Sequence, residues 1–562
     1  MTRQSMLFWC AALWAVATAP ALSADAAAGK SLFRERCSVC HTAESGDNGG
    51  AQGPSLIGIM GRAAASEAQF PYTAALRDSK LTWNAASLQR FLAAPGAVVP
   101  GTSMLVAVPN ETERGNLIAY FQSVANQPRA PEAAIAVPAS SVTSANWRLD
   151  APGQTHKIAA DSLPPPFATA STRNNSSVVA KPAAAALSLP PGFHADVFAE
   201  GLSGPRKMLV AANGDILVTE MRGGRVTVLH PSPDGTRSAR SDVLLQGLRQ
   251  PFGLAFYPNA QNPQWLYVAE TNRVMRYAFR TGDVKLRGTG QVVVAELPSG
   301  VGHSTRDIAF SPDGKRLFVS VGSGSNVAET MPKKTPAEIK AWEAQHGLGA
   351  AWGVETDRAG VLEFDATSPA APTNYANGIR NCVSLTVQPS SGALWCTTNE
   401  RDALGDDLVP DYSTRVAQGA FYGWPWYYIG SNEDPRLKGD RPDLNGKVSV
   451  PDVLYQSHSA ALSMTFYTAT KGKSAFPAEY VGDALVGLHG SWNRSLRTGY
   501  KLVRIRTKNG EPTGGYADFL TGFVVDDAHV WGRPVATVEL PDGSLLMSED
   551  GNNVIFRISY PH

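Results

Sequence analysis

Two cysteines and a histidine in the motif CSVCH have the types and spacing that covalent haem attachment requires. Cys37 and Cys40 lie three positions apart, so their thiols can reach both vinyl groups of one haem, and the adjacent His41 presents an imidazole to the iron. A redox dithiol or a zinc knuckle uses the same cysteine spacing, but neither explains His41, and zinc would lack two further ligands. The motif therefore predicts one covalent haem c with His41 as an axial ligand.

The second axial ligand of an electron-carrying haem is commonly a soft, neutral group. Met104 in VPGTSM is the candidate for this position. Met60 is the alternative, although it lies in the apolar run LIGIM, which is typical of packing. With both axial positions filled, we expect the haem to transfer electrons and to bind no substrate.

The segments around the motif resemble a class I cytochrome c over residues 25–126. The resemblance is carried by GPSLIGIMGR, FPYTAAL, LTW and ERGNLIAYF. It implies a small all-α domain in which Pro54 braces His41, and in which the two terminal helices cross at Phe33 and Tyr120. Three further residues would surround the haem propionates: Arg62, Tyr72 and Trp83.

The first residues of the chain have the pattern of a secretory signal peptide. Arg3 supplies a positive charge, residues 6–17 are apolar, and residues 21–26 are small. We expect cleavage near Ala24, which removes residues 1–24 and leaves a soluble protein, or one peripheral to a membrane, in the periplasm. An uncleaved membrane anchor is the alternative, but the apolar run is short for a span.

Two cysteines remain after the signal and haem cysteines are assigned. Cys382 and Cys396 lie on two strand-like runs joined by the turn QPSSG. A disulfide between them suits an oxidising compartment. Two separate buried thiols are the alternative, because only geometry decides between them.

Length and charge limit the classes of function. The chain has 562 residues, enough for two or three domains. Its 50 basic and 49 acidic residues leave a formal charge of +1, which excludes a strong field for nucleic acid. The 52 glycines and 39 prolines indicate the many turns of an all-β repeat architecture.

The middle of the chain is poor in large apolar residues. Residues 127–186 are rich in Ala, Pro and Ser, which predicts a semi-extended linker. Trp147 and the segment DAPGQTHKI are the parts that would pin it onto a neighbour.

Between residues 187 and 562 a sequence motif of two strands around a turn recurs six times. This repeat predicts a six-bladed β-propeller with long loops. Its clearest copies are GLRQPFGLAFYPN...WLYVAE, TRDIAFSPDGKRLFVSVG and GRPVATVELPDGSLLMSED. One inserted helix is expected after Thr335, with Pro336 in its first turn, Glu338 completing a capping box and Gly347 ending it. The predicted fold is thus an all-β six-bladed β-propeller preceded by a small all-α cytochrome c domain.

Arginines and two histidines recur at the predicted strand edges. They are His303 in GHSTRD, Arg380 and Asn381 in GIRN, Glu400 to Asp407 in NERDALGDD, His489 and Arg494 in HGSWNR, and Arg533 in WGRP. Arginines that converge on one channel mouth indicate a planar polyanionic ligand, because a guanidinium grips carboxylates with two hydrogen bonds. Beside a haem, a redox cofactor is the economical interpretation.

The propeller region is similar to the pyrroloquinoline quinone (PQQ) dehydrogenases of the soluble glucose and sorbosone/pyranose type. HGSWNR, GHSTR followed by IAFSPDG, and the YGWP of FYGWPWYY carry the resemblance. It implies that His303 is the general base for a hydroxyl or a hydrated aldehyde. Arg380 would stabilise charge on the reacting quinone oxygen, and Asn381 would help to hold it.

The same resemblance implies how the cofactor is bound. Arg494 and Arg533 would clamp the PQQ carboxylates. A calcium ion would act on the quinone as a Lewis acid, held by the backbone carbonyls of Glu400 and Arg401.

Each assignment has a structural alternative. His303 could be an ordinary turn histidine, Arg494 and Arg533 could pair with surface acids, and Asp406 and Asp407 could be loop residues. Three aromatic residues could either form core or line the sugar site: Tyr422, Trp424 and Trp426.

One departure from the glucose enzymes concerns the base. In those enzymes an aspartate from the following strand end orients the histidine, whereas VSVGSGSN offers Ser323 and Asn326 but no carboxylate. Either Asp307 or another loop acid orients His303, or the base is tuned differently. The sorbosone/pyranose branch is therefore the closer match, and glucose is a poor guess at the substrate.

Together these features predict a periplasmic quinohaemoprotein dehydrogenase. It would oxidise a sugar or sugar aldehyde with PQQ and pass electrons to its own haem c, then to a respiratory cytochrome, oxidase or quinone pool. A calcium-dependent propeller hydrolase or lactonase is one alternative, but it would want several carboxylates around the metal. A non-catalytic docking propeller is the other, and it leaves the arginines unexplained.

Overall fold

The computed structural model describes residues 24–38, 41–44, 53–67, 70, 72–102, 104, 106–125, 146–286, 288–300, 302–328, 330–366 and 371–561. Nearly all of the predicted signal peptide, and Cys40 of the haem motif, lie outside these residues. Within the described ranges, no helix has both the length and the apolar character of a membrane span.

The N-terminal part is a small helical domain. Its helices are α1 (Ala26–Arg36), α2 (Ala74–Asp78), α3 (Ala85–Ala93), α4 (Pro95–Val98) and α5 (Glu111–Ser123). The rings of Phe33 in α1 and Tyr120 in α5 are 5.5 Å apart, which confirms the predicted crossing of the terminal helices. Gly29 permits this crossing, because a Cβ there would lie 1.9 Å from the carbonyl oxygen of Asn116.

The C-terminal part is a six-bladed propeller, as the repeats predicted. Blades one to three, each listed from the inside outwards, are β4 (Pro205–Val210), β5 (Ile216–Glu220), β6 (Arg225–Pro231) and β7 (Ser238–Gln246); β8 (Leu254–Tyr257), β9 (Trp265–Glu270), β10 (Arg273–Ala278) and β11 (Gln291–Val294); and β12 (Ile308–Phe310), β13 (Arg316–Val321), β14 (Gly360–Asp365) and β15 (Thr373–Asn377).

Blades four to six complete the ring. They are β16 (Cys382–Val387), β17 (Leu394–Thr398), β18 (Tyr412–Arg415) and β21 (Val453–Leu454); β22 (Ala461–Phe466), β23 (Ala484–Leu488), β24 (Lys501–Ile505) and β27 (Tyr516–Leu520); and β29 (Pro534–Glu539), β30 (Leu545–Glu549), β31 (Val554–Ser559) and β3 (His194–Ala199). Two short ribbons lie in loops: β19 (Tyr427–Tyr428) with β20 (Asn432–Glu433), and β25 (Thr507–Lys508) with β26 (Glu511–Pro512).

The sixth blade joins the two ends of the propeller sequence. Its outermost strand β3 comes before blade one in the chain, and it pairs antiparallel with the last strand, β31. Backbone hydrogen bonds between the first and the last strand of the propeller sequence therefore close the ring.

The innermost strands β4, β8, β12, β16, β22 and β29 contact one another in turn around the axis. We call the end of the propeller at which these six strands begin the mouth. Just inside it, Phe252, Val383, Leu462, Val535 and Ala536 form one buried apolar cluster. An ion pair between Lys207 and the fully buried Asp307, 2.6 Å long, joins β4 to the loop before β12. The axial channel is thus filled beneath the mouth.

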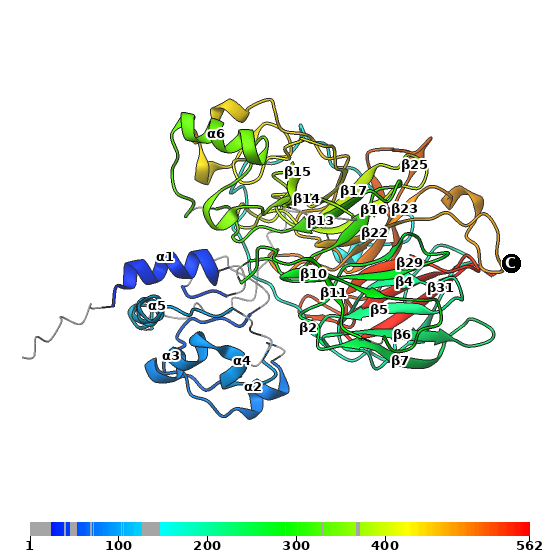
Figure 1. Cartoon of the computed structure of the whole chain (residues 1–562), viewed down its shortest axis with the longest axis horizontal. Coiled ribbons are helices and arrows are strands. Elements are labelled where there is room, and N and C mark those ends of the chain that lie inside the picture. Colours follow the sequence, from blue (N-terminus) through cyan, green and yellow to red (C-terminus); the bar gives the residue numbers. More distant parts are fainter. Residues whose placement is uncertain are drawn as a thin grey trace, which may run out of the picture.

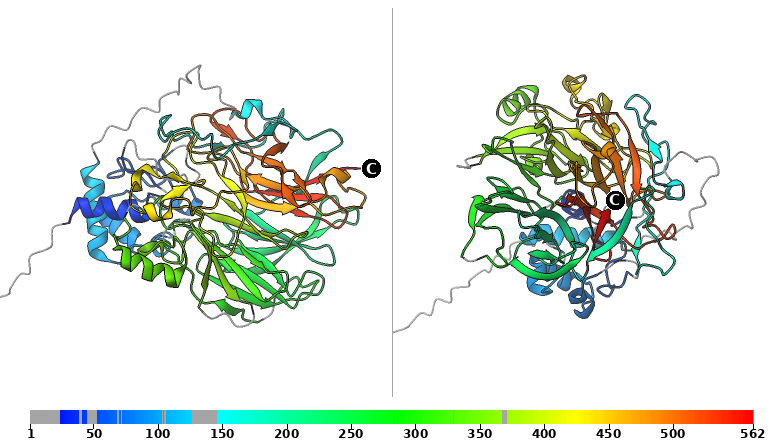
Figure 2. Two further views of the ribbon diagram at one scale, coloured as in Figure 1. Left: turned by 90° about the horizontal axis from the view of Figure 1, so that it is seen from above. Right: turned by 90° about the vertical axis from the view of Figure 1, so that its right-hand side faces the viewer.

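The inserted helix α6 (Pro336–His346) forms as predicted. Thr335 caps it, Glu338 completes the capping box, and Gly347 follows it with a φ of +84°. Since α6 follows β13, it projects from the mouth end of the propeller. Figures 1 and 2 show the helical domain at this same end, so the two domains meet on the mouth side.

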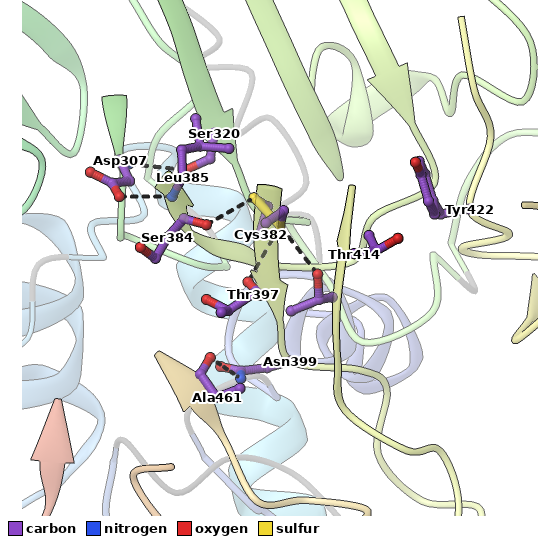
Figure 3. Close-up of a disulfide and its surroundings, with 12 residues drawn as sticks. Asp307, Ser320, Cys382, Ser384, Leu385, Thr397, Asn399, Thr414, Tyr422 and Ala461 are labelled. Carbon is purple, nitrogen blue, oxygen red and sulfur yellow. Dashed lines mark hydrogen bonds between the residues drawn. A yellow bond between two sulfur atoms is a disulfide. The ribbon is translucent and has the colours of Figure 1, made fainter. Parts of the chain in front are cut away.

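The two remaining cysteines form a disulfide, one of the two alternatives that the sequence left open, and it links Cys382 in β16 to Cys396 in β17. Figure 3 shows it beside Asp307, whose carboxylate accepts from the backbone N–H of Leu385. The cross-link therefore lies in blade four, the neighbour of the blade that His303 precedes, close to the mouth.

Residues 146–186, which we call the strap, pack along the mouth and the neighbouring blades, which the Ala/Pro composition did not predict. The strap contributes β1 (Thr155–His156), which pairs with β27, and β2 (Ser177–Val178), which pairs with β28 (His529–Val530). Trp147 and the DAPGQTHKI segment do pin it down, as expected: the Trp147 indole donates to Asp527, and Asp150 pairs with Lys501 at 2.7 Å.

Candidate functional site

His303 is the central residue of the mouth. It lies in the loop before β12 and is 8% exposed. Its Nδ1 is 2.9 Å from the carbonyl oxygen of Ser323, and its backbone N–H donates to the same oxygen. A carbonyl only accepts, so Nδ1 carries the proton and Nε2 keeps its lone pair. This tautomer is the one a general base requires.

Among the described residues no carboxylate contacts the His303 ring, so of the two alternatives the structure supports a base that is tuned differently and is not oriented by Asp307. Asp307 instead pairs with Lys207 at 2.6 Å and accepts from the N–H of Leu385 at 2.8 Å. The backbone of Ser323, at the end of β13, takes the orienting role. The orienting group therefore comes from the strand end VSVGSGSN, but it is a backbone carbonyl and not a side chain.

The environment of His303 favours the neutral ring. Burial, the largest cause, lowers the pKa of His303 well below its usual value, and the positive charge of Arg380 lowers it further. Around neutral pH the imidazole is therefore unprotonated and able to accept a proton.

Arg380 lies beside His303 and is held on every nitrogen. Its Nε donates to the Asn326 carbonyl, Nη1 to the Glu400 carbonyl at 2.7 Å, and Nη2 to Asn326 Oδ1 and Asp402 Oδ2, both at 3.1 Å. The side chain is buried. The guanidinium is thus a fixed positive charge at the mouth, one that can stabilise negative charge through its field.

Asn381 completes the group of three predicted residues. Its Oδ1 is buried and has no hydrogen-bond partner. A Cβ added to Gly322 would lie 2.4 Å from this oxygen and 2.6 Å from the Cβ of His303, so Asn381 and His303 face one another across a glycine. An orphan acceptor at this point costs stability unless a ligand donates to it.

The loop that carries Ser323 is itself held by a buried acid. Glu355, in the short helix η2 (Gly353–Glu355), accepts from the Gly324 N–H and the Ser325 hydroxyl, each at 2.6 Å. Ser323 also donates its N–H to the carbonyl of Arg380 at 2.8 Å. The orienting carbonyl and Arg380 therefore share one framework.

The sequence did not single out a second group around Asp402. This carboxylate accepts from Arg380 through Oδ2 and from Asn493 through Oδ1 at 2.7 Å. Asn493 also donates to Nδ1 of His458, whose Nε2 is 3.1 Å from the Gly405 carbonyl. His458 is buried and has a φ of +68°, a strained conformation for histidine that is common at functional sites. The fragments HGSWNR and NERDALGDD carried the only signal for this group.

The two arginines predicted to clamp a cofactor lie in separate places. Arg494 donates to the Asp406 carbonyl and to the Asp407 carboxylate, both at 2.6 Å, next to the Asp402 group. Arg533 begins blade six, and its Nη2 donates to Ser176 of the strap. Both side chains keep a buried Nε without a partner. Each guanidinium therefore has a donor left for an anionic ligand.

Arg533 belongs to a further charged group. The other members are Arg206, His489 and Asp550. The Asp550 carboxylate pairs with Arg206 at 2.5 Å and with His489 at 2.8 Å. Burial lowers the pKa of His489, although Asp550 opposes this.

The predicted calcium ligands have other roles in the structure. The Glu400 carbonyl accepts from Arg380 Nη1, and the fully buried Arg401 side chain pairs with Glu400 and Asp434. Calcium takes six to eight oxygens, and the described residues hold no group of three or more acidic, histidine or cysteine side chains that could hold a metal ion. A guanidinium beside the Glu400 carbonyl also repels a cation. Calcium binding by the backbone carbonyls of Glu400 and Arg401 stays a prediction, and we derive no step through it.

The helical domain presents an imidazole suited to haem iron. Nδ1 of His41 is 2.7 Å from the Pro54 carbonyl, which confirms that Pro54 braces it and leaves Nε2 for the metal. A Cβ on Gly53 would lie 2.3 Å from the His41 ring, so the ring packs directly on that glycine. Met104 and Met60 both pack against the core of this domain, and Met104 stays the predicted second ligand.

Other predicted residues of this domain are core residues. Cys37 is buried, and so are Tyr72 and Trp83. Arg62 donates to the Ile57 carbonyl. In the propeller, the aromatic residues of FYGWPWYY are also buried, although the Trp424 indole donates to the Asn326 carbonyl beside Arg380.

Comparisons with known proteins agree with this arrangement. The profile described as TrAA12-like matches residues 187–412 and 440–560, and the cytochrome c profile matches residues 26–125. Cytochrome c of Tetrahymena pyriformis is 44% identical over 101 residues, which cover 18% of this chain and 89% of the relative.

Two solved structures show the same propeller fold. A family AA12 carbohydrate-active enzyme of Trichoderma reesei has a TM-score of 0.54 at 20% identity, covering 69% of this chain and all of that one. The holo PQQ domain of pyranose dehydrogenase from Coprinopsis cinerea has a TM-score of 0.53 at 19% identity, covering 67% of this chain and 97% of that one. The chain belongs to the TrAA12-like family and carries an N-terminal cytochrome c domain.

Proposed function

We propose that the chain is a periplasmic dehydrogenase that oxidises a sugar or sugar aldehyde with PQQ at the propeller mouth. Its electrons pass to its own haem c, and then to a respiratory cytochrome, oxidase or quinone pool. The observation that carries the proposal is the group of His303, Arg380 and Asn381, assembled at the end of the propeller where the cytochrome domain lies.

His303 performs the proton transfer. The Ser323 carbonyl holds the Nδ1 proton, so Nε2 accepts the proton of a substrate hydroxyl or of a hydrated aldehyde. The ring is neutral before the reaction because burial and Arg380 lower its pKa. The same two effects destabilise the imidazolium that forms, so His303 gives up the proton readily afterwards.

Arg380 and Asn381 supply the electrostatics. The fixed guanidinium stabilises negative charge that develops on an oxygen beside it, and its protein partners prevent it from moving. The unpartnered Oδ1 of Asn381 can accept from a hydroxyl that reaches the group. The apolar cluster beneath the mouth keeps bulk water from approaching from the channel.

The residues present fit a planar polyanion at the mouth. Arg494 and Arg533 would hold carboxylates of PQQ through their remaining N–H donors, and Asn381 would take one hydrogen bond from the ligand. When bound, PQQ supplies the two-electron acceptor for the alcohol or aldehyde carbon. The relative from Coprinopsis cinerea, named as a pyranose dehydrogenase, supports a sugar as the substrate class.

The residues also fit a c-type haem. Cys37 and Cys40 would attach it, and His41 with Met104 would fill its axial positions. When bound, the haem supplies a one-electron carrier on the same chain. A tether places such a carrier at an effective concentration in the millimolar range.

The experiment is anaerobic visible spectroscopy of the haem-loaded chain, re-oxidised and mixed with PQQ and a panel of sugars and sugar aldehydes. We expect the reduced c-type band to appear only when PQQ and one class of sugar are both present, with and without added calcium as separate arms. His303→Ala should abolish the signal, whereas His194→Gln, which changes an exposed histidine on β3, should leave it intact. Haem that ascorbate reduces but no sugar reduces would overturn the proposal.

A further inference from the structure

The strap fixes one arginine between two anchor points on the mouth. On one side, the Ser171 hydroxyl accepts from the Gly405 N–H at 3.2 Å. On the other, Asn174 donates its N–H to the Trp492 carbonyl at 2.6 Å and its Nδ2 to the Ser495 carbonyl at 3.0 Å. Arg173 lies between these two anchors in the chain. The strap is therefore held at Ser171, two residues before Arg173, and at Asn174, one residue after it.

The anchors themselves are firm. The fully buried Arg497 donates to the carbonyl and Oδ1 of Asn174, at 2.8 and 3.0 Å. Two residues further on, Ser176 accepts from Arg533 and from the hydroxyl of Tyr500, at 3.1 and 3.0 Å. The stretch 171–176 is therefore built onto the same loops that carry Arg494 and Arg533.

From this position Arg173 leaves the propeller and contacts the cytochrome domain. Its Nη1 donates to the Thr42 hydroxyl at 2.5 Å, and Thr42 in turn donates to the Ser55 hydroxyl at 3.1 Å. Thr42 is buried and directly follows His41, and the positive charge of Arg173 acts on the His41 ring. Arg173 therefore contacts the haem-binding edge of the domain.

We infer that residues 171–176 are a docking surface for the cytochrome domain, and that Arg173 holds the His41 edge against the mouth. This inference rests on the proposed function, and it identifies the partner surface of that site within the same chain. Asn174 donates to the carbonyl of Ser495, the neighbour of Arg494, and Arg173 donates to Thr42, the neighbour of His41. Because Arg173 and Asn174 are also adjacent in the chain, covalent bonds and hydrogen bonds connect the Arg494 loop to His41 without a gap. Since electron transfer slows steeply with distance, a docked edge is the arrangement that lets the carrier domain serve the mouth.

The first test measures the haem midpoint potential of the full chain by spectroelectrochemical titration, without PQQ or sugar. Removing a nearby positive charge destabilises the reduced haem, so Arg173→Ala should lower the potential, and Arg173→Lys should restore most of it. Arg148→Ala is the matched control, because Arg148 ties the strap to Asp527 and donates to no residue of the cytochrome domain that the structure describes. Equal potentials in the wild type and Arg173→Ala would overturn the inference.

The second test follows electrons by stopped flow in PQQ-loaded protein. Sugar-driven haem reduction should slow by about tenfold in Arg173→Ala, the contribution of one charged hydrogen bond to a docking equilibrium. Reduction of phenazine methosulfate, a small acceptor that takes electrons directly from the mouth, should stay unchanged. Thr42→Val, which removes the acceptor and keeps the charge, should slow haem reduction in the same way.

The outcomes separate the inference from the proposed function. If dye reduction is sugar-dependent and the haem rate of Arg173→Ala equals that of the wild type, docking through Arg173 is wrong and the enzyme assignment stands. If Arg148→Ala slows the haem equally, general attachment of the strap explains the effect, which also overturns the inference. If no sugar reduces dye or haem in the wild type, the proposed function fails, and the potential measurement still decides the docking.

Discussion

The orienting group of His303 is a neutral carbonyl, and this has a consequence for its chemistry. A carboxylate would stabilise the protonated ring and raise its pKa, whereas the Ser323 carbonyl orients the ring without a countercharge. Arg380 adds a positive charge on the same side. Under the proposed function, His303 is therefore a weak base that is unprotonated near neutral pH and that releases its proton easily.

The pH dependence of the reaction follows from this. Because the pKa of His303 is lowered, the ring stays unprotonated above that lowered value, and base activity is lost only as the pH falls through it. We expect kcat/KM for sugar oxidation to show no inflection at the ordinary histidine pKa near 6.5. A profile that loses half its activity there would contradict the burial and charge argument.

Removal of the base should have a large effect. General base catalysis contributes about 10²–10⁴-fold, so His303→Ala should lower kcat by that factor while the protein stays folded. Dye-linked turnover under anaerobic conditions measures the rate, and circular dichroism checks the fold. A variant with more than a tenth of the wild-type kcat would exclude His303 as the base.

Gly322 is a second sensitive residue. A Cβ there would lie within 3 Å of both Asn381 Oδ1 and the His303 side chain, so Gly322→Ala must separate the two. We expect a loss of kcat that exceeds any change in thermal stability. Gly300→Ala is a contrasting control outside the group, since nothing lies within 4 Å of the added carbon there, although its φ of +87° adds some strain.

At the scale of elements, the loop 322–326 depends on a buried acid from η2. Burial raises the pKa of Glu355, while the Ser325 hydroxyl and the Gly324 N–H lower it. Both oxygens of Glu355 accept from this loop, and the loop holds the Ser323 carbonyl in place. Glu355 thus helps to fix the position of the His303 ring without contacting it, because it acts through the loop and the Ser323 carbonyl.

Glu355→Gln tests this support. A glutamine keeps one acceptor and turns an NH2 group toward the other donor, so stability should fall by about 1–3 kcal/mol. The rate should fall as well, with kcat affected more than KM, because ring orientation is lost and sugar contacts are not. Denaturant unfolding and steady-state kinetics measure the two effects. An unchanged kcat would show that Ser323 is held without Glu355.

Some of these elements were predictable from local rules. The α6 caps follow from a short motif with fixed geometry, and the resemblance to cytochrome c implied the Pro54 carbonyl at His41 and the crossing of α1 and α5. The disulfide was one of two alternatives that only geometry could decide. The role of Ser323 was not predictable, because every residue has a backbone carbonyl and the direction of that carbonyl depends on the path of the loop. The strap also escaped prediction: its polar residues are satisfied by the propeller, which composition alone does not register.

At the scale of the whole molecule, the helical domain lies at the mouth end of the propeller. The propeller provides a proton acceptor and a fixed cation at its mouth, and the helical domain presents the His41 edge toward the same end. Under the proposed function, oxidation and electron removal are therefore separable tasks of the two domains.

This separation can be tested with Cys37→Ala/Cys40→Ala, which removes the attachment of haem in the full chain. We expect sugar oxidation with phenazine methosulfate to continue near the wild-type rate, because the mouth is intact. Reduction of an added acceptor cytochrome should be lost. Retention of cytochrome reduction would show that electrons leave the mouth without the helical domain.

The way in which the sixth blade is completed bears on how the protein is made. Strand β3 precedes blade one in the chain and its partner β31 follows β30, so the ring cannot close until the whole propeller sequence is available. Pairing between such distant segments slows folding, because the intervening loop must close before the contacts form. An unfinished chain of this kind therefore keeps an open ring, and the propeller becomes rigid only once β31 pairs with β3.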